Sequence, residues 1–435
     1  MKKYLIILLL SVGLYAQGFD GIGLGFAGTY GPLSRGVHAL AYNPANVAVP
    51  RNNVLELNFI GLNLGMFNNS FSYNTYQDYF VTNGKENYWD QGKKKSFLDL
   101  IPDDGWKISN DIDVNIMGLA FNNFALAIHP VAFGEVQNTQ IKNILNLVLY
   151  GDDITRDYAL DYPNIMQGSM FSAVEVSLGY AYPIPIKKYV PDISFMSVGI
   201  GINYYMGLGV MQIENSEAHV KRTQFDNYET IETQAYNKVR VAYAEDATPA
   251  GKGRSYNLGV SGLYKNQWFV SLSFMNIGGK INYSINTERL LIEDTHQITI
   301  YRDVDSSSTT FDHSVDTTLT IDDFSTGVPS YMRLGVAYYF KKNLVFTSEW
   351  KQGLNKAFGN STTPRLGFGV QYKPLWWLPL RSGVSFGGST GFLMGLGFGL
   401  DFHYISLDFS YAMKNALWPT HSEGLFLGFN FMIRI

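Results

Sequence analysis

The chain has 435 residues, among them 29 Tyr, 29 Phe and 7 Trp, and charged residues make up 16% of it. Soluble domains carry about a quarter charged residues on average, so this composition indicates a deep core or contact with lipid. The formal net charge is −4, and nucleic-acid binding, which needs a basic surface, is excluded. The sequence has no cysteine, which excludes disulfides, thiolate metal sites, cysteine nucleophiles and a lipid-modified N-terminal cysteine.

The first residues have the pattern of a secretory signal peptide, which we place at residues 1–16. Lys2 and Lys3 give a positive start, Tyr4–Leu14 is apolar, and Ala16 precedes the expected cleavage site. This run is much shorter than the roughly 20 residues that a helix needs to cross a bilayer. No later segment is long and apolar enough either, so the exported protein is predicted to be a soluble fold or a closed barrel.

Apolar residues recur at every second position along most of the chain, which is the period of a β-strand with two unlike faces. In residues 331–340, for example, Met332, Leu334 and Val336 alternate with Arg333 and Gly335. The large apolar face and the small face of Gly and Ser are typical of strands that face lipid on one side. A large soluble β-protein is the alternative, and it fits the strand spacing and the signal peptide less well.

This alternation predicts an all-β fold, a transmembrane antiparallel barrel of fourteen strands in residues 54–435. The predicted strands are Val54–Phe67, Asp111–Asn122, Asn123–Glu135, Gly168–Tyr182, Ile193–Gln212, Tyr256–Tyr264, Gln267–Asn276, Tyr331–Phe340, Leu344–Lys351, Pro364–Lys373, Leu380–Gly387, Phe392–Leu400, His403–Met413 and Gly424–Ile435.

Connections between these strands alternate between short and long, as expected when one end of a barrel faces the periplasm. The long ones, expected to be extracellular loops, are Asn68–Asn110, Val136–Gln167, Ile213–Ser255 and Ile277–Ser330. Short helices are expected within two of them, at Lys94–Ile101 and Gln140–Leu149. The last long loop is rich in Asp and Glu, which we interpret as a solvated acidic surface rather than a divalent-cation site.

Residues 17–53 do not alternate and precede the first strand, so they lie in the periplasm or inside the barrel. Their residue types favour a plug in the lumen, with Arg35, Tyr42, Asn43 and Pro44 as its candidate residues. Asn43 is expected to cap a short helix that begins at Pro44, because proline lacks the N–H that the first helical position leaves unused.

The run that ends in Tyr42-Asn43-Pro44-Ala45, together with fourteen strands, resembles the FadL/TodX type of outer-membrane transporters for hydrophobic compounds. Similar barrels include PorV-like secretion barrels and uncharacterised Bacteroidetes-type barrels, and residues 378–383 and 101–105 look more like the latter. The resemblance implies an N-terminal plug and a route for lipophilic ligands. The chain ends in Ile435, where many such barrels end in Phe.

The small face of the predicted strands carries charges of both signs. Its basic residues include Arg333, Arg365 and Arg381, and its acidic residues include Glu175, Glu349 and Asp408. Ion pairs that brace the barrel and the plug are the favoured interpretation, because an unpaired charge in a plugged lumen is costly. The alternative is a substrate-binding site in which these three arginines receive a carboxylate through bidentate hydrogen bonds.

Catalytic and cofactor motifs find no support in the sequence, so we expect no enzyme activity, no cofactor and no metal. The G-x-G-x-x-G at Gly23–Gly28 follows a signal peptide rather than a strand, and the G-x-S-x-G at Gly383–Gly387 lies within an alternating strand. An enzyme barrel would need a strand-borne Ser/His/acid set, which we do not find.

The sequence therefore predicts a transporter or channel for hydrophobic or amphipathic small molecules, such as long-chain fatty acids, in the outer membrane of a Gram-negative-type bacterium. Its expected partners are outer-membrane lipid and a hydrophobic ligand. A secretion-associated barrel that binds a secreted protein is the alternative.

Overall fold

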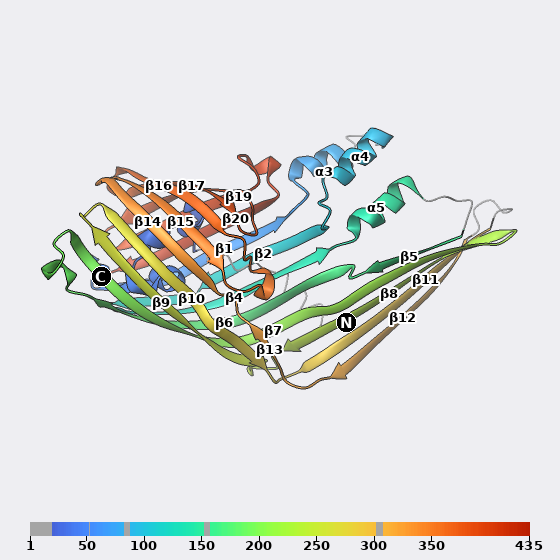
Figure 1. Ribbon diagram of the computed structural model, residues 1–435, viewed down its shortest axis with the longest axis horizontal. Helices are drawn as coiled ribbons and strands as arrows, with labels where there is room; N and C mark the ends of the chain where they lie inside the picture. The colour runs from blue at the N-terminus through green and yellow to red at the C-terminus, as the bar shows by residue number, and fades with distance from the viewer. Residues whose placement is uncertain (1–19, 52, 82–87, 152–156, 302–307) are drawn as a thin grey trace.

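The computed structural model describes residues 20–51, 53–81, 88–151, 157–301 and 308–435, and their strands form a closed antiparallel barrel (Figure 1). Fourteen strands form the wall of the barrel, with β2 and β3 counted together as one. They follow one another in chain order, and the last one pairs with the first. In order they are β1 (Leu55–Asn68), β2 (Trp106–Asn115) with β3 (Met117–Phe121), β4 (Phe124–Asn138), β6 (Met166–Pro183), β7 (Ile193–Gln224), β9 (Gly251–Tyr264), β10 (Trp268–Tyr283), β14 (Tyr331–Lys341), β15 (Leu344–Gly353), β16 (Arg365–Leu375), β17 (Leu378–Gly387), β18 (Leu393–Phe402), β19 (Ile405–Lys414) and β20 (Gly424–Arg434).

Each of the fourteen predicted strands corresponds to one strand of the wall, so the predicted fold class is confirmed. The predicted signal peptide, residues 1–16, lies outside the described residues. The two faces of the wall are also as predicted. Leu334, Phe346 and Phe368 on the outer face are 43%, 45% and 50% exposed, whereas Gly383 and Ser385 on the inner face are buried. The outer surface is therefore apolar, and the lumen is lined by small and polar residues.

One predicted strand, Asp111–Asn122, is divided in the structure into β2 and β3. The pairing with β1 keeps one register from Asn58↔Gly118 to Gly61↔Asn115, although the ladder is interrupted between these two pairs. On the other side β4 carries Pro130, which has no N–H to donate to a neighbouring strand. The strand is interrupted at Ile116, where its register with β4 shifts by one residue between Met117↔Ile128 and Asp113↔Val131.

Two predicted loops were wrong, because Ile213–Ser255 and Ile277–Ser330 consist largely of strands. The strand β7 continues to Gln224 and pairs there with β5 and β8, and β11 pairs with β8 and β12. These strands form a sheet that projects beyond the wall, in the order β5–β7–β8–β11–β12 (Figure 1). We call it the projecting sheet, and its strands besides β7 are β5 (Tyr158–Pro163), β8 (Tyr228–Tyr243), β11 (Thr287–Tyr301) and β12 (Ser308–Thr320). A further short strand, β13 (Phe324–Gly327), pairs with β10.

Three helices lie at the same end of the barrel as the projecting sheet, which we call the long-loop end (Figure 1). They are α3 (Tyr73–Phe80), α4 (Gln91–Asp99) and α5 (Ile141–Tyr150). The sequence predicted α4 and α5 but not α3, which Ser72 begins by accepting a hydrogen bond from the Thr75 backbone N–H at 3.2 Å. Among the described residues, no helix has the length and apolar character that crossing a membrane requires.

Candidate functional site

Residues 20–51 fold into the lumen as a plug, the blue segment inside the barrel in Figure 1. Short helical turns succeed one another, and Leu24, Phe26, Tyr42 and Val47 have no exposed surface. The turns are η1 (Gly23–Phe26), η2 (Gly31–Leu33), η3 (Gly36–His38), α2 (Ala39–Tyr42) and η4 (Pro44–Ala48). The plug therefore serves as the core of the barrel.

Glycines of the inner wall allow the plug backbone to approach closely. A Cβ at Gly383 would lie 2.3 Å from the Phe26 carbonyl oxygen, and one at Gly395 would lie 2.2 Å from the Leu24 carbonyl oxygen. Both distances are shorter than carbon and oxygen can approach. The small residues that alternate with large apolar ones in the sequence thus face inward and leave room for the plug backbone.

Asn43 anchors the plug to the wall and also caps a helical turn. Its side-chain oxygen accepts a hydrogen bond from the Ala45 N–H at 2.9 Å, at the start of η4. Its side-chain nitrogen donates to the carbonyl oxygens of Val260 on β9 and Leu272 on β10, at 3.1 and 3.2 Å. Pro44 occupies the first position of η4.

Arg35 also joins the plug to the wall. Its guanidinium lies 4.3 Å from the centre of the Phe269 ring and donates hydrogen bonds to the Pro32 carbonyl oxygen at 2.9 Å and to the Tyr339 hydroxyl at 3.2 Å. Cation–π contacts of this kind are stronger when water is excluded. Arg35 is therefore held by partners from both the plug and the wall.

An ion pair within the plug joins Asp20 to His38. The carboxylate lies 2.5 Å from the His38 Nδ1 and also accepts a hydrogen bond from the Tyr42 hydroxyl at 3.3 Å. Burial would raise the pKa of Asp20, but the charge and hydrogen bond of His38 outweigh burial and lower that pKa. Burial would lower the pKa of His38, and the Asp20 carboxylate outweighs it and raises that pKa. Both effects favour the charged pair.

Basic side chains form a row across three adjacent strands of the inner wall. Arg333 on β14 is directly opposite Lys351 on β15, which is directly opposite Arg365 on β16. All three are buried, and Arg333 forms an ion pair with Glu349. Like charges at paired positions repel each other, and the Glu349 carboxylate beside Arg333 offsets part of the positive charge of this row.

Tyr331 links the basic row to the rest of the lumen. The Lys351 ammonium lies 4.3 Å from the centre of its ring, and the Arg333 guanidinium lies 5.1 Å from it. The Arg333 guanidinium also lies 4.7 Å from the Tyr42 ring of the plug, and Arg365 donates to the Gly28 carbonyl oxygen at 3.4 Å. The basic row is thus in contact with the plug.

Arg381 does not belong to this group, although the sequence analysis placed it with Arg333 and Arg365. It forms an ion pair with Asp408 at 2.6 Å and donates a hydrogen bond to Gln371 at 3.1 Å. On β16, Gln371 is six residues beyond Arg365, or roughly 20 Å along the strand. The structure therefore joins Arg333 and Arg365 through Lys351 and places Arg381 elsewhere in the lumen.

The lumen opens at the long-loop end as a polar vestibule of about 750 Å³. Amides and hydroxyls dominate its lining, among them Gln137, Gln167, Gln212, Asn360 and Thr362. An apolar layer lies next to the vestibule and includes Phe171, Val210, Tyr283, Val328 and Phe358.

Phe358 reaches this layer from the connection between β15 and β16. Its ring centre lies 4.5 Å from that of Phe171. The backbone of Phe358 has φ 47° and ψ 47°, a left-handed conformation that is unfavourable for a residue with a side chain. The packing of the ring against the apolar layer supports this conformation.

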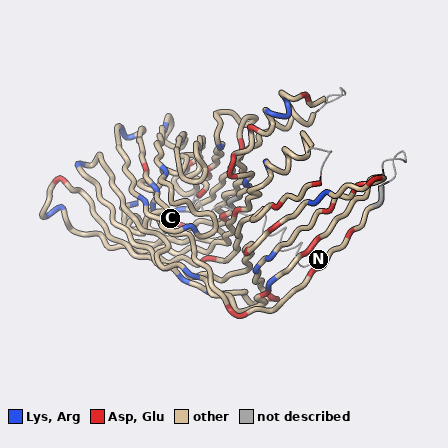
Figure 2. Tube along the Cα trace, turned by 45° about the vertical axis from the view of Figure 1, so that its right-hand side comes forward, with Lys and Arg blue, Asp and Glu red and all other residues tan. Residues whose placement is uncertain are grey.

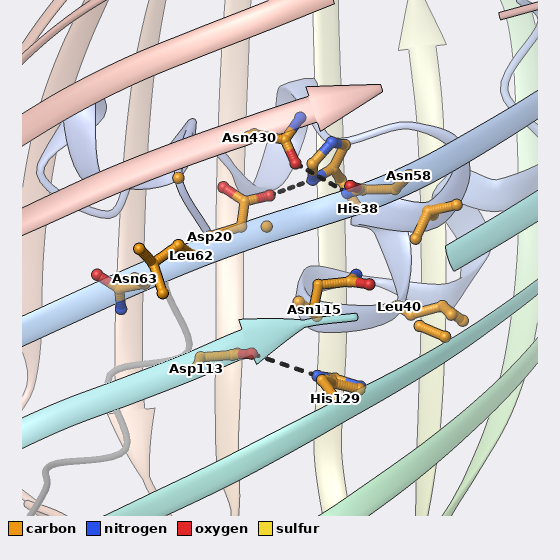
Figure 3. A pocket seen from close by; sticks show the side chains of 15 residues that line it. Asp20, His38, Leu40, Asn58, Leu62, Asn63, Asp113, Asn115, His129 and Asn430 are labelled. Atoms are coloured by element: carbon orange, nitrogen blue, oxygen red, sulfur yellow. Dashed lines mark hydrogen bonds and ion pairs between the residues drawn. The ribbon is translucent and has the colours of Figure 1, made fainter. Parts of the chain in front are cut away.

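Two small cavities lie beside the plug. One of about 50 Å³ touches Val131, Val328 and Tyr331. The other, of about 40 Å³, is surrounded by Asn58, Asn63, Asn115 and Asn430, beside the Asp20–His38 pair (Figure 3). Cavities of this size hold water molecules rather than a lipid. The described residues thus show the lumen in a closed state.

Several buried polar atoms at the asparagine-lined cavity have no hydrogen-bond partner among the described residues. They are the Asn58 Oδ1, both polar side-chain atoms of Asn63, the Asn115 Oδ1, the Asn430 Nδ2 and the His38 Nε2. Buried donors and acceptors without partners cost free energy. The cavity therefore favours water or another small molecule that both donates and accepts hydrogen bonds.

A Ser/His/acid set on the strands, which the sequence analysis did not find, is present in the lumen. The Ser177 Oγ lies 3.1 Å from the His129 Nε2, and the His129 Nδ1 lies 3.5 Å from Asp113 (Figure 3 shows the His129–Asp113 pair). However, the Ser177 hydroxyl donates to Glu175 at 2.9 Å instead of to His129. The arrangement holds a histidine between two carboxylates and does not activate a nucleophile. The described residues contain no cluster of His, Asp and Glu that could hold a metal ion.

The wall, the plug and the closed lumen define an antiparallel β-barrel of fourteen strands with a plug in its lumen. Residues 44–408 match the family described as "Family of unknown function (DUF5723)", and the chain belongs to this family. No curated protein matches the sequence.

Solved structures that are similar to this chain include a transporter, a channel and a FadL homologue. The toluene transporter TodX of Pseudomonas putida is 10% identical, with a TM-score of 0.49 over 97% of this chain and 99% of its own. A FadL homologue of Pseudomonas aeruginosa is 13% identical, with a TM-score of 0.45 over 95% of this chain and 98% of its own. The monoaromatic hydrocarbon channel CymD is 11% identical, with a TM-score of 0.45 over 97% of this chain and 99% of its own.

Proposed function

We propose that this protein is a non-enzymatic channel of the bacterial outer membrane for small amphipathic molecules with an anionic headgroup, such as long-chain fatty acids. The observation that carries the proposal is the position of Tyr331. Its ring forms part of the cavity that touches Val131 and Val328 of the apolar layer, and it also contacts Lys351 and Arg333 of the basic row. An apolar tail and an anionic head thus find adjacent partners.

The outer face of the wall supports placement in a membrane. Exposed apolar side chains recur along neighbouring strands, for example Leu258, Leu334, Phe346 and Phe368. A continuous apolar band of this kind is unfavourable in water and favourable in a bilayer. We therefore propose that outer-membrane lipid surrounds the barrel and that the long-loop end faces the outside of the cell.

The vestibule and the plug suggest the route. A solute that enters from the long-loop end meets the polar vestibule first, then the apolar layer with Phe358, and then the basic row beside the plug. Passage requires the apolar layer to open and the plug to move, because the cavities beside the plug are water-sized.

Mass spectrometry of small molecules that co-purify with the protein tests this proposal. The full-length protein is isolated in detergent, next to an unrelated outer-membrane barrel expressed in the same cells. We expect an excess of long-chain carboxylates over the unrelated barrel, and a smaller excess in the variant Arg365→Gln. A profile that is the same for both proteins would contradict an anionic amphipathic ligand.

A further inference from the structure

The projecting sheet ends in an open edge. The strand β12 has 13 residues and pairs with β11 in continuous register from Glu288↔Thr320 to Ile300↔Ser308. Within the described residues, its other edge pairs with no strand. Residues 310–320 are exposed along their whole length. The free edge therefore presents a row of backbone N–H and C=O groups to the surroundings.

Apart from its two aspartates, Asp312 and Asp316, this edge lacks the features that normally prevent pairing with another chain. Natural edge strands are short, or carry Pro or Lys, or contain a bulge. β12 contains neither Pro nor Lys, and its ladder with β11 has no register shift. The opposite edge of the same sheet is protected, because β5 has 6 residues and ends in Pro163. The β5 edge of the projecting sheet is thus better protected against pairing with another chain than the β12 edge.

The two faces of β12 have different chemistry. Phe311, Val315 and Leu319 lie on one face and are 58%, 39% and 44% exposed. Asp312 and Asp316 lie on the other face. On β11, Asp312 is opposite His296, with 2.6 Å between the carboxylate and Nδ1, and Asp316 is opposite Ile292. Acidic residues recur along the strands of the projecting sheet (Figure 2).

We propose that β12 is the docking edge for an extended segment of another protein, which adds to the projecting sheet as a further strand and alternates basic with apolar residues. Backbone hydrogen bonds along the open edge supply affinity, and alternate side chains supply specificity. Lys or Arg of the segment lies on the face of Asp312 and Asp316, and its apolar residues lie on the face of Phe311, Val315 and Leu319. The inference does not depend on transport through the lumen.

A second copy of this chain is a poorer occupant of the edge. Antiparallel pairing of two β12 strands about Ser314 would place Asp312 of each copy opposite Asp316 of the other. Like charges at directly opposite positions are destabilising. Charge complementarity therefore favours a basic partner over self-association.

Binding of synthetic peptides to the full-length protein in detergent tests the proposal by fluorescence anisotropy. The probe is a labelled peptide in which Lys alternates with Val or Thr, and a second peptide carries Glu in place of Lys. A third has the Lys sequence with alternate backbone nitrogens methylated, which removes hydrogen bonds and keeps the charge. We expect the first peptide to bind, and the Glu peptide and the methylated peptide each to bind at least tenfold more weakly.

Protein variants provide a matched comparison. Asp312→Asn with Asp316→Asn should weaken binding of the Lys peptide roughly three- to tenfold, as expected for the loss of two cross-strand charge pairs. Asp322→Asn with Asp323→Asn removes the same charge just beyond β12 and should leave binding unchanged. Equal binding of the methylated and unmethylated peptides would overturn the proposal, because strand addition needs the backbone groups. Sedimentation that shows dimers lost on Ser314→Pro would overturn it in favour of a second copy.

Discussion

Gly383 of the wall lies directly against the Phe26 carbonyl oxygen of the plug, so that a Cβ at this glycine would be 2.3 Å from the oxygen. The oxygen belongs to the backbone and cannot rotate away as a flexible side chain would. The η1 turn can therefore lie against β17 because residue 383 has no Cβ.

Substitution of this glycine should displace the plug. Gly383→Ala forces the η1 turn away from the wall, and overpacking of this kind costs about 1–3 kcal/mol. We expect a lower unfolding temperature and a larger single-channel conductance in planar bilayers. Gly262→Ala on β9 is the control, because its nearest neighbour, the Phe195 carbonyl oxygen, would be 3.4 Å away. Equal behaviour of the two variants would contradict the close fit at Gly383.

Loss of Asn43 should cost more than the loss of a helix cap. A cap alone contributes about 1 kcal/mol, but Asn43 also donates to Val260 and Leu272. Three hydrogen bonds at about 1 kcal/mol each predict that Asn43→Ala lowers the free energy of unfolding by about 2–4 kcal/mol. Denaturant unfolding in detergent measures this, with the exposed Asn227→Ala as the control. A loss below about 1 kcal/mol would show that the wall anchors contribute nothing.

The Asp20–His38 pair predicts a pH dependence of plug stability. The raised pKa of His38 gives stability that is complete below its ordinary value of 6.5 and is lost as the pH rises through the raised value. The lowered pKa of Asp20 gives stability that is complete above its ordinary value of 3.8 and is lost as the pH falls through the lowered value. The pair should therefore stabilise the plug most between about pH 4 and 6.5.

Thermal unfolding of the protein at pH 5.5 and pH 9 checks this dependence. We expect a lower unfolding temperature at pH 9, and a smaller difference between the two pH values in His38→Gln, which cannot carry the charge. An identical pH dependence in the wild-type protein and in His38→Gln would assign the effect to other groups.

The orientation of the barrel is testable because the chain has no cysteine. Lys356 is exposed at the vestibule, and Lys265 is exposed in the short turn between β9 and β10. A membrane-impermeant maleimide added to intact cells should label Lys356→Cys but should label Lys265→Cys only after the outer membrane is disrupted. The opposite pattern would reverse the proposed topology.

The wall was predictable from sequence because alternate residues face different surroundings. Residues that face lipid must be apolar, and residues that face the plug must be small. Leu334 must be apolar because it faces outward, and Gly335 must be small because a Cβ there would lie 2.8 Å from Pro32 of the plug. The strands β8, β11 and β12 have polar residues on both faces, and their alternation is weak. For this reason they resembled loops in the sequence.

The arrangement of the lumen depends on strand register, which alternation alone does not determine. Arg333, Arg365 and Arg381 all lie at inward positions. Strand pairing places Lys351 between the first two, whereas Arg381 forms an ion pair with Asp408. Likewise, His129 and Ser177 meet because β4 pairs with β6 in the register His129↔Glu175. No short motif in the sequence predicts these contacts.

Uptake of a radiolabelled long-chain fatty acid into cells with and without the protein measures the proposed transport itself. We predict faster uptake in cells that contain it, and a selective loss for the acid, compared with a neutral hydrocarbon, in the variant Arg365→Lys, because a bidentate guanidinium contact has no equivalent in lysine. Folding of the variant is checked by heat-modifiable migration on gels. Fatty-acid uptake at the same rate in both kinds of cell would contradict the account.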